Sequence, residues 1–343
     1  MRKILQYFLK KPLTWMANKL AASPRQDMVF NSLTQLYQQG FDANNTNVKL
    51  LEADAVKNKF IIFSDQHKGN KSWADDFKQS EINYVAALEY YNAQGFSFIN
   101  LGDSEELWKF NVTELLPANE KSLKAEAAFH PHRYIKTFGN HDIIWKDKFA
   151  VSFYLKKYFA LPLVVCEGII IKIKGLTIPL NIFLTHGHQG DLMSDNNAVS
   201  TWIVAHIWMP LQRFLRINVN SASTDYSLRN LHNKMMYEWS SQQNNLLLIT
   251  GHTHRPVFAA GRYLDHPSNK IYDAEEEKTF LSPCYFNSGC CCFDDSDITG
   301  IEIADGFIRL IKWYDEGNTS KRKVLEEIML QKLVEDLDAP SVP

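Results

Sequence analysis

Five segments of the chain end in short clusters of aspartate, asparagine and histidine, and each cluster follows an apolar run of strand-like length. The clusters are Asp65-Gln66-His67, Gly102-Asp103, Gly139-Asn140-His141-Asp142, His186-Gly187-His188 and Gly251-His252-Thr253-His254. A short apolar run bounded by glycine and polar residues is typical of a buried strand. Ligands of α/β sheets bind outside the carboxyl ends of the strands, so we expect the five clusters to meet in one place.

The first half of the chain alternates between strand-like and helix-like segments. Strands are expected at residues 60–63, 96–101 and 134–138, and helices at residues 76–94 and 119–129. This alternation predicts an α/β layer architecture. Further strands are expected at residues 164–173, 177–185 and 246–250, and Asp305-Gly306 between two apolar runs predicts a hairpin.

Three other segments have a different character. Residues 1–57 are expected to be mainly helical, and residues 316–343 to form a charged tail with a peripheral helix. Residues 192–245 do not fit the strand pattern, because their apolar side chains recur at helical spacing in two runs. We interpret them as a helical insertion, which either packs on the core or covers the metal site with an apolar wall.

The residue types in the clusters point to divalent metal ions. Carboxylates and imidazoles together suit ions of intermediate hardness. Residues two apart in a strand point to the same side, so Asp65 with His67, and His252 with His254, each present two ligands to one pocket. Asp103 has two oxygens and can bridge two metals. Two ions about 3.5–4 Å apart stabilise the attacking and leaving oxygens of a phosphoryl displacement.

In this order, D-x-H, G-D-x-x-E, G-N-H-D, H-G-H and G-H-T-H resemble the motifs of the calcineurin-like metallophosphoesterases over residues 58–315. The resemblance implies a four-layer αββα sandwich with two divalent ions, of which Mn, Fe and Zn are the candidates. It assigns one metal to Asp65, His67, Asp103 and His254, and the other to Asp103, Asn140, His186 and His252. It also implies that His141 is the catalytic imidazole and that Glu106 is its acidic partner. His188 is expected either to support a ligand or to be a plain turn residue.

The implied reaction is hydrolysis of a phosphate ester or anhydride through a metal-bridging hydroxide. Asn140, Arg255 and Lys68 are candidates for holding the substrate phosphate, because they lie in or beside the motifs. The insertion gives a weaker resemblance to the UDP-2,3-diacylglucosamine hydrolase branch, which usually carries arginine where His141 stands here. The expected substrate is therefore a phosphorylated small molecule or a lipid-linked phosphate.

Two alternatives stay open at this point. One is a pyrophosphatase that cleaves a nucleotide-sugar or lipid-linked diphosphate. The other is a non-catalytic scaffold with the same fold. Relatives of the scaffold kind typically lose ligands or the catalytic histidine, whereas every expected ligand position is filled here.

Composition limits the partners and the compartment. The formal net charge of −2 provides no overall basic field, which argues against a nucleic-acid partner. The five cysteines include no C-x-x-C pair, so we expect reduced, buried thiols, with 290–292 in the core, and a cytoplasmic location.

The basic N-terminus raises the question of membrane contact. Residues 1–26 contain basic residues and no acidic one, with apolar side chains at roughly helical spacing. This segment either packs on the domain or lies on the inner face of an anionic membrane. No apolar stretch reaches the ~18 residues of a membrane-spanning helix, so none is expected.

Overall fold

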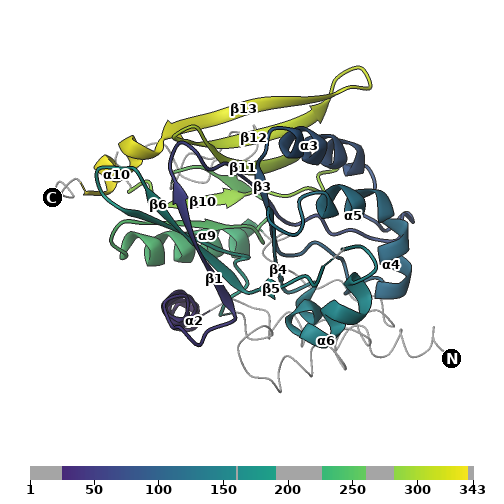
Figure 1. The fold of residues 1–343 in the computed structure, drawn as a ribbon, viewed down its shortest axis with the longest axis horizontal. Coiled ribbons are helices and arrows are strands. Elements are labelled where there is room, and N and C mark those ends of the chain that lie inside the picture. The colour runs from purple at the N-terminus through teal and green to yellow at the C-terminus, as the bar shows by residue number, and fades with distance from the viewer. Residues whose placement is uncertain (1–24, 160, 191–225, 260–281, 339–343) are drawn as a thin grey trace.

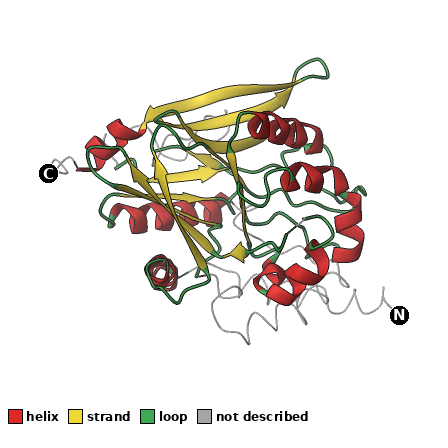
Figure 2. Ribbon diagram, in the orientation of Figure 1, coloured by secondary structure: helices red, strands yellow, loops and turns green. Residues whose placement is uncertain are grey.

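The computed structural model describes residues 25–159, 161–190, 226–259 and 282–338. Two β-sheets pack face to face, and helices cover the outer face of each sheet (Figure 1, Figure 2). The described residues therefore form the four-layer αββα sandwich that the motifs implied. The segments 1–24 and 191–225, which include most of the predicted basic N-terminus and the first half of the predicted insertion, lie outside the described residues.

The first sheet carries the parallel strands that lead to three of the motif loops. Its strand order is β13-β12-β11-β2-β3-β4-β5, and β2, β3 and β4 are parallel neighbours. All four residues of β2 are buried, as expected for a strand covered on both faces. The strands are β2 (Phe60–Phe63), β3 (Ser97–Leu101), β4 (Tyr134–Thr137), β5 (Val165–Cys166), β11 (Ile298–Ala304), β12 (Phe307–Asp315) and β13 (Ser320–Met329).

The second sheet carries the strands that lead to the other two motif loops. Its order is β1-β6-β7-β8-β10-β9, and β7 runs parallel to β8. Its strands are β1 (Val48–Asp54), β6 (Gly168–Lys174), β7 (Leu180–Thr185), β8 (Leu246–Thr250), β9 (Pro256–Val257) and β10 (Tyr285–Ser288). The carboxyl ends of β2, β3, β7 and β8 lie at the same side of the sandwich, so the motif loops of the two sheets can contact one another.

Three apolar cores separate the four layers. Isoleucines and leucines of both sheets, such as Ile99 and Ile182, fill the space between the sheets. An aromatic-rich core around Phe98 lies under α3 (Glu81–Ala93), α4 (Val112–Ala118) and α5 (Glu120–Ala127). The third core lies under α2 (Gln26–Gln39) and α9 (Tyr226–Ser241).

Short helices complete the described chain. After β4 the chain forms η1 (Ile143–Lys146), α6 (Lys148–Ala150) and η2 (Val151–Leu155), and it ends in α10 (Leu330–Asp338). None of the helices in these ranges is both long and apolar enough to cross a bilayer.

Two predictions of secondary structure were wrong. Residues 1–57 were expected to be mainly helical, but residues 48–54 form β1, which pairs in parallel with β6 through every residue. Residues 320–329 were assigned to a helical tail, but they form β13 against β12, and α10 begins only at Leu330. Both strands lie at a sheet edge with charged residues toward solvent, so their apolar alternation is weak.

The described part of the insertion belongs to the core. Residues 226–241 form the second predicted helical run, α9, and its Met235, Met236 and Trp239 are buried against the second sheet. Trp239 also donates a hydrogen bond from Nε1 to Thr34 of α2, at 2.9 Å. In these residues the packing alternative holds.

We predict that Trp239→Ala lowers the free energy of unfolding by about 3–5 kcal/mol, because it opens a cavity between α9, α2 and the second sheet. Urea unfolding of the purified protein measures the change. Trp73→Ala is the matched control, since Trp73 is 91% exposed and Trp239 is 1% exposed. Equal effects of the two substitutions would contradict the packing of α9.

Candidate metal centre and active site

The motif loops are joined to one another by backbone hydrogen bonds. The amide of Asp65 donates to the carbonyl of Gly102 at 3.1 Å, and the amide of His67 donates to the carbonyl of Asp103 at 3.0 Å. Across the sheets, the amide of His252 donates to Asp65 Oδ2 at 2.9 Å. The amide of Gly251 also donates to the carbonyl of His186 at 3.0 Å, so hydrogen bonds link the loops after β2, β3, β7 and β8.

One group of potential metal ligands consists of Asp65, His67 and His254. Their ligand atoms all lie within 4.8 Å of one another. His254 Nε2 lies 2.9 Å from His67 Nε2 and 3.3 Å from Asp65 Oδ1. Two imidazole nitrogens and a carboxylate oxygen thus point at the same small space.

A second group consists of Asp103, His186 and His252, again within 4.8 Å of one another. Asp103 Oδ2 lies 3.1 Å from His186 Nε2 and 3.8 Å from His67 Nε2 of the first group. Asp103 therefore stands between the two groups, which is the position that a bridging ligand requires.

Asn140 follows β4, in the loop that contacts Asp103 through the next residue. Its Oδ1 is buried and has no hydrogen-bond partner among the described residues. The neighbouring amide of His141 donates to Asp103 Oδ1 at 2.8 Å, which ties this loop to the proposed bridge. A buried oxygen that has no protein partner is expected where a cation completes its coordination.

The space for the ions depends on a missing side chain at Gly139. A Cβ there would collide with Asp103 Oδ1 and lie 2.7 Å from His186 Nε2. The convergent oxygen and nitrogen donors, the unsatisfied Asn140 oxygen and this close approach all fit divalent metal ions.

The electrostatics of the groups also favour cations. Burial alone would raise the pKa of Asp103, but His186 and His141 hold it well below the usual range. Burial alone would lower the pKa of His186, but the charges of Asp103 and Asp65 raise it to about 9. The buried carboxylates are thus held ionised by positive charge, which metal ions also provide.

His141 and Glu106 form a pair at the edge of the first group. His141 Nδ1 lies 2.9 Å from Glu106 Oε1, and Glu106 Oε2 lies 3.1 Å from His67 Nδ1. One buried carboxylate therefore orients both the proposed catalytic imidazole and a proposed metal ligand. Although burial opposes it, the charge of His141 and the hydrogen bonds hold the pKa of Glu106 well below its usual range.

Comparison with known proteins agrees with this geometry. A family model of the calcineurin-like phosphoesterases matches residues 58–256, more than half of the chain. The chain belongs to the calcineurin-like phosphoesterases. The family is dinuclear-metal dependent, and the two groups joined by Asp103 supply candidate ligands for such a centre. No curated protein matches the chain.

Solved structures give only distant similarity. Vacuolar protein sorting 29 from Cryptosporidium parvum is 11% identical, covers 79% of this chain and 98% of its own, and has a TM-score of 0.34. A dimetal phosphatase from Danio rerio is 9% identical to this chain and has a TM-score of 0.38. The match covers 78% of this chain and 99% of the phosphatase.

Two side chains at the site of this family member were not singled out in the sequence. Trp108 stacks on the His141 ring at 3.9 Å and donates from Nε1 to the Asn140 carbonyl at 3.0 Å. His232 of α9 is buried, and its ring lies 5.0 Å from that of His252. Neither has a motif around it, so only the folded chain brings them to the site.

The neighbouring imidazoles of His188 and His232 are neutral. Burial lowers the pKa of His188 to about 3 and that of His232 to about 4. The His188 ring lies 5.5 Å from that of His186. His188 is therefore buried near a proposed ligand, and its supporting role stays a prediction.

Lys68 does not fit the predicted substrate-binding role. Its side chain is wholly buried, and Nζ donates to Ser104 Oγ at 2.7 Å and contacts both Glu105 and Glu126. Its cation is thus neutralised beneath the motif loops and faces no open space. Arg255 directly follows His254 and is also buried, and its predicted role stays a proposal.

Beneath the site lies a buried polar network that includes Lys68. Glu105 accepts from Lys136 Nζ and Trp145 Nε1 at 2.9 and 2.7 Å. Asp142 accepts from the amides of Gly139 and Ser104 at 2.7 and 2.9 Å, which joins the loops after β3 and β4. This network holds the loops that carry Asp103 and Asn140 in place.

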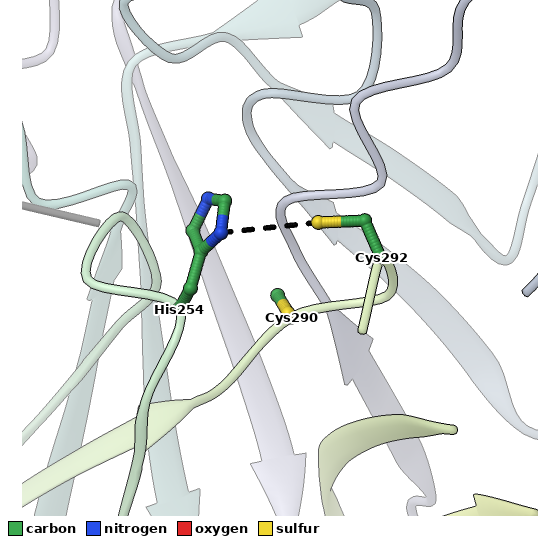
Figure 3. A group of neighbouring side chains, drawn as sticks. All are labelled: His254, Cys290 and Cys292. Atoms are coloured by element: carbon green, nitrogen blue, oxygen red, sulfur yellow. Dashed lines mark hydrogen bonds between the residues drawn. The ribbon is translucent and has the colours of Figure 1, made fainter. Parts of the chain in front are cut away.

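The cysteine run 290–292 was predicted to be core, and this prediction was wrong for one residue. Cys290 and Cys291 are buried, but Cys292 is partly exposed and its Sγ lies 3.8 Å from His254 Nδ1 (Figure 3). All five cysteines are free thiols. The cytoplasmic location stays a prediction.

We predict that Glu105→Gln lowers the free energy of unfolding by about 3 kcal/mol near neutral pH, because two buried lysines lose a shared counterion. Lys136 and Lys68 lower the pKa of Glu105 from its ordinary 4.5 to about 2, against the effect of burial. The stabilisation is therefore full above the unfolded-state pKa and is lost as pH falls toward 2.

Urea unfolding of both proteins from about pH 7 to about pH 3 checks this dependence. The difference between them should shrink as the pH falls below 4.5. Glu120→Gln is the control, because Glu120 is exposed and forms its ion pair with Lys124 on the same helix. A difference that grows in acid would contradict the proposed charge state of Glu105.

Proposed function

We propose that this chain is a metal-dependent phosphoesterase that hydrolyses a phosphate ester or anhydride, with His141 as the proton donor to the leaving oxygen. The observation that carries the proposal is the link from Asp103 through His141 to Glu106. A chain that only kept the fold as a scaffold has no need of an imidazole anchored at both its backbone and its ring.

Two divalent ions, when bound, supply an acidified water as nucleophile and positive charge for the phosphoryl oxygens. Asp65, His67, Asp103 and His254 would hold one ion, and Asp103, Asn140, His186 and His252 the other. Manganese is the first ion to test, because the donors are a mixture of oxygen and nitrogen. Arg255 and the Asn140 amide are the proposed contacts to substrate phosphate.

The pair of Glu106 and His141 defines the proton transfer. Nδ1 of His141 donates to Glu106, which leaves Nε2 as the ring atom available to the leaving oxygen. Trp108 lies flat against the ring and restricts its rotation. The imidazole is thus held in one orientation before substrate binds, and such preorganisation favours general acid catalysis.

We predict that His141→Ala lowers kcat by about 10²–10⁴-fold while the metal content stays unchanged, because the proton donor is lost and every proposed ligand remains. Elemental analysis and steady-state kinetics with Mn²⁺ measure both quantities. His132→Ala serves as the control, since His132 is exposed and outside the site. Unchanged turnover in the His141 variant would remove it from the mechanism.

A substrate panel separates the remaining alternatives. Bis(p-nitrophenyl) phosphate, p-nitrophenyl phosphate and nucleotide diphosphates distinguish a diesterase, a monoesterase and a pyrophosphatase. Protein that binds no metal and stays inert toward all three with Mn²⁺ would instead favour the scaffold.

An exposed surface on the segment that follows the His141 loop favours a lipid-linked phosphate among the possible substrates. Phe149 and Phe153, which follow the His141 loop, are 75% and 68% exposed and stack on each other with centroids 6.0 Å apart. Lys146, Lys148, Lys156 and Lys157 are exposed in the same segment. Exposed aromatic side chains among lysines are typical of a surface that binds anionic membranes.

We predict that the protein binds phosphatidylglycerol vesicles and that Phe149→Ser with Phe153→Ser weakens this binding at least tenfold. The loss follows from removing two apolar side chains that would enter the interface. Co-sedimentation at low and high salt measures the binding. Trp73→Ser is the control for an exposed aromatic elsewhere. Binding that survives the double substitution would remove this surface as the membrane contact.

A further inference from the structure

Cys290 and Cys292 form a cluster with His254. Neither cysteine belongs to the two proposed metal groups, whereas His254 is a member of the first. One ligand atom from each of Cys290, Cys292 and His254 lies within 4.8 Å of the others. Figure 3 shows the Cys292 sulfur pointing at the His254 ring. The ring atom that it faces is Nδ1, at 3.8 Å, whereas Nε2 faces Asp65 and His67 on the other side.

The backbone holds these thiols in place. The carbonyl of Cys290 accepts from the amide of Thr299 at 3.0 Å, and the amide of Cys291 donates to the carbonyl of Asp65 at 3.1 Å. Cys291 packs into the core with Ile298 and Phe63, so it is separated from its two neighbours. The run of three thus divides into one core thiol and two thiols at His254.

The chemistry of this cluster differs from that of the centre beside it. Two sulfurs and an imidazole nitrogen select thiophilic ions, while the carboxylate-rich groups suit harder ones. With zinc–sulfur and zinc–nitrogen bonds of about 2.3 and 2.0–2.1 Å, tetrahedral geometry separates sulfur from nitrogen by about 3.6 Å. The observed 3.8 Å between Cys292 Sγ and His254 Nδ1 therefore needs little adjustment.

We propose that Cys290, Cys292 and Nδ1 of His254 form a third metal site, selective for thiophilic ions such as Zn²⁺ or Cd²⁺. Binding releases the protons of both thiols and of Nδ1 to solvent, and solvent water fills the fourth position. The ion enters from the exposed side, since the His254 side chain is 22% exposed and Cys292 is only partly buried.

Sharing His254 couples this site to the proposed phosphoesterase centre. An ion on Nδ1 lies across the imidazole ring from the metal on Nε2, so the two cations repel each other. An excess of a thiophilic ion should therefore reduce Mn²⁺ retention. This coupling rests on the proposed function, but the existence of the site does not.

Titration of the metal-free, reduced full-length protein with Cd²⁺ tests the site. Sulfur-to-cadmium charge transfer in the ultraviolet should appear and saturate at one ion per chain. The double variant Cys290→Ser with Cys292→Ser should lose this absorption, and elemental analysis after saturation should find one ion fewer per chain. Cys166→Ser and Cys284→Ser are matched controls with buried thiols elsewhere, and they should keep the signal.

The single variant Cys292→Ser covers the case in which the double variant does not fold, because Cys292 is the least buried of the five. It should weaken Cd²⁺ binding at least tenfold with unchanged circular dichroism. Absence of the absorption in wild-type protein, or an unchanged Cd²⁺ affinity in the Cys292 variant, would overturn the proposal. Both readouts are independent of hydrolysis, so failure of the third site and failure of the phosphoesterase function are distinguishable.

Discussion

The site depends on an unusual backbone conformation at the residues that carry its chemistry. Asp65, His67, Asp103, His252 and His254 all have φ between 49° and 68°, in the left-handed region that residues other than glycine rarely adopt. Such a conformation costs about 1 kcal/mol or more at each position and persists only where surrounding contacts enforce it. Here it lets each chain turn sharply at its strand end and aim a side chain into the shared space.

The enforcing contacts come from neighbouring loops and from the layer beneath them. The amides of Asp65 and His67 are fixed by the loop after β3, and the carbonyl of Asp65 is fixed by Cys291. Below, Asp142 accepts from two loop amides, and its pKa rises to about 7 through burial despite nearby Lys136. Because no single strand end is self-sufficient, the ligands are assembled by the fold as a unit.

The sequence was informative wherever local pattern and chemistry coincided. The strands at 60–63 and 246–250 were predicted at their observed bounds, because each is a fully buried apolar run followed by a polar motif. The edge strands β1 and β13 were missed because their exposed faces carry charged residues, which blur the alternation. Pairing partners decide such strands, and those partners are distant in sequence.

Contacts between distant parts of the chain also explain why the roles of some site residues were predicted wrongly or missed. A lysine directly after D-x-H looks like a phosphate contact, and nothing local reveals that Glu105 and Glu126 enclose Lys68. Trp108 and His232 reach the site from a loop and from a helix without any motif. Side chains whose role depends on non-local packing cannot be identified from the residues around them.

His254 shows how one side chain connects two kinds of chemistry. Its Nε2 faces a carboxylate and an imidazole, and its Nδ1 faces a thiol, so the two ring nitrogens lie in different surroundings. The group at the second nitrogen of a ligand imidazole sets its tautomer and its strength as a donor. A sulfur there is softer and more easily modified than the carbonyl or carboxylate that commonly fills this place. The metal affinity of the first group is therefore open to influence from solvent through Cys292, although the Asp65 carboxylate of that group is wholly buried.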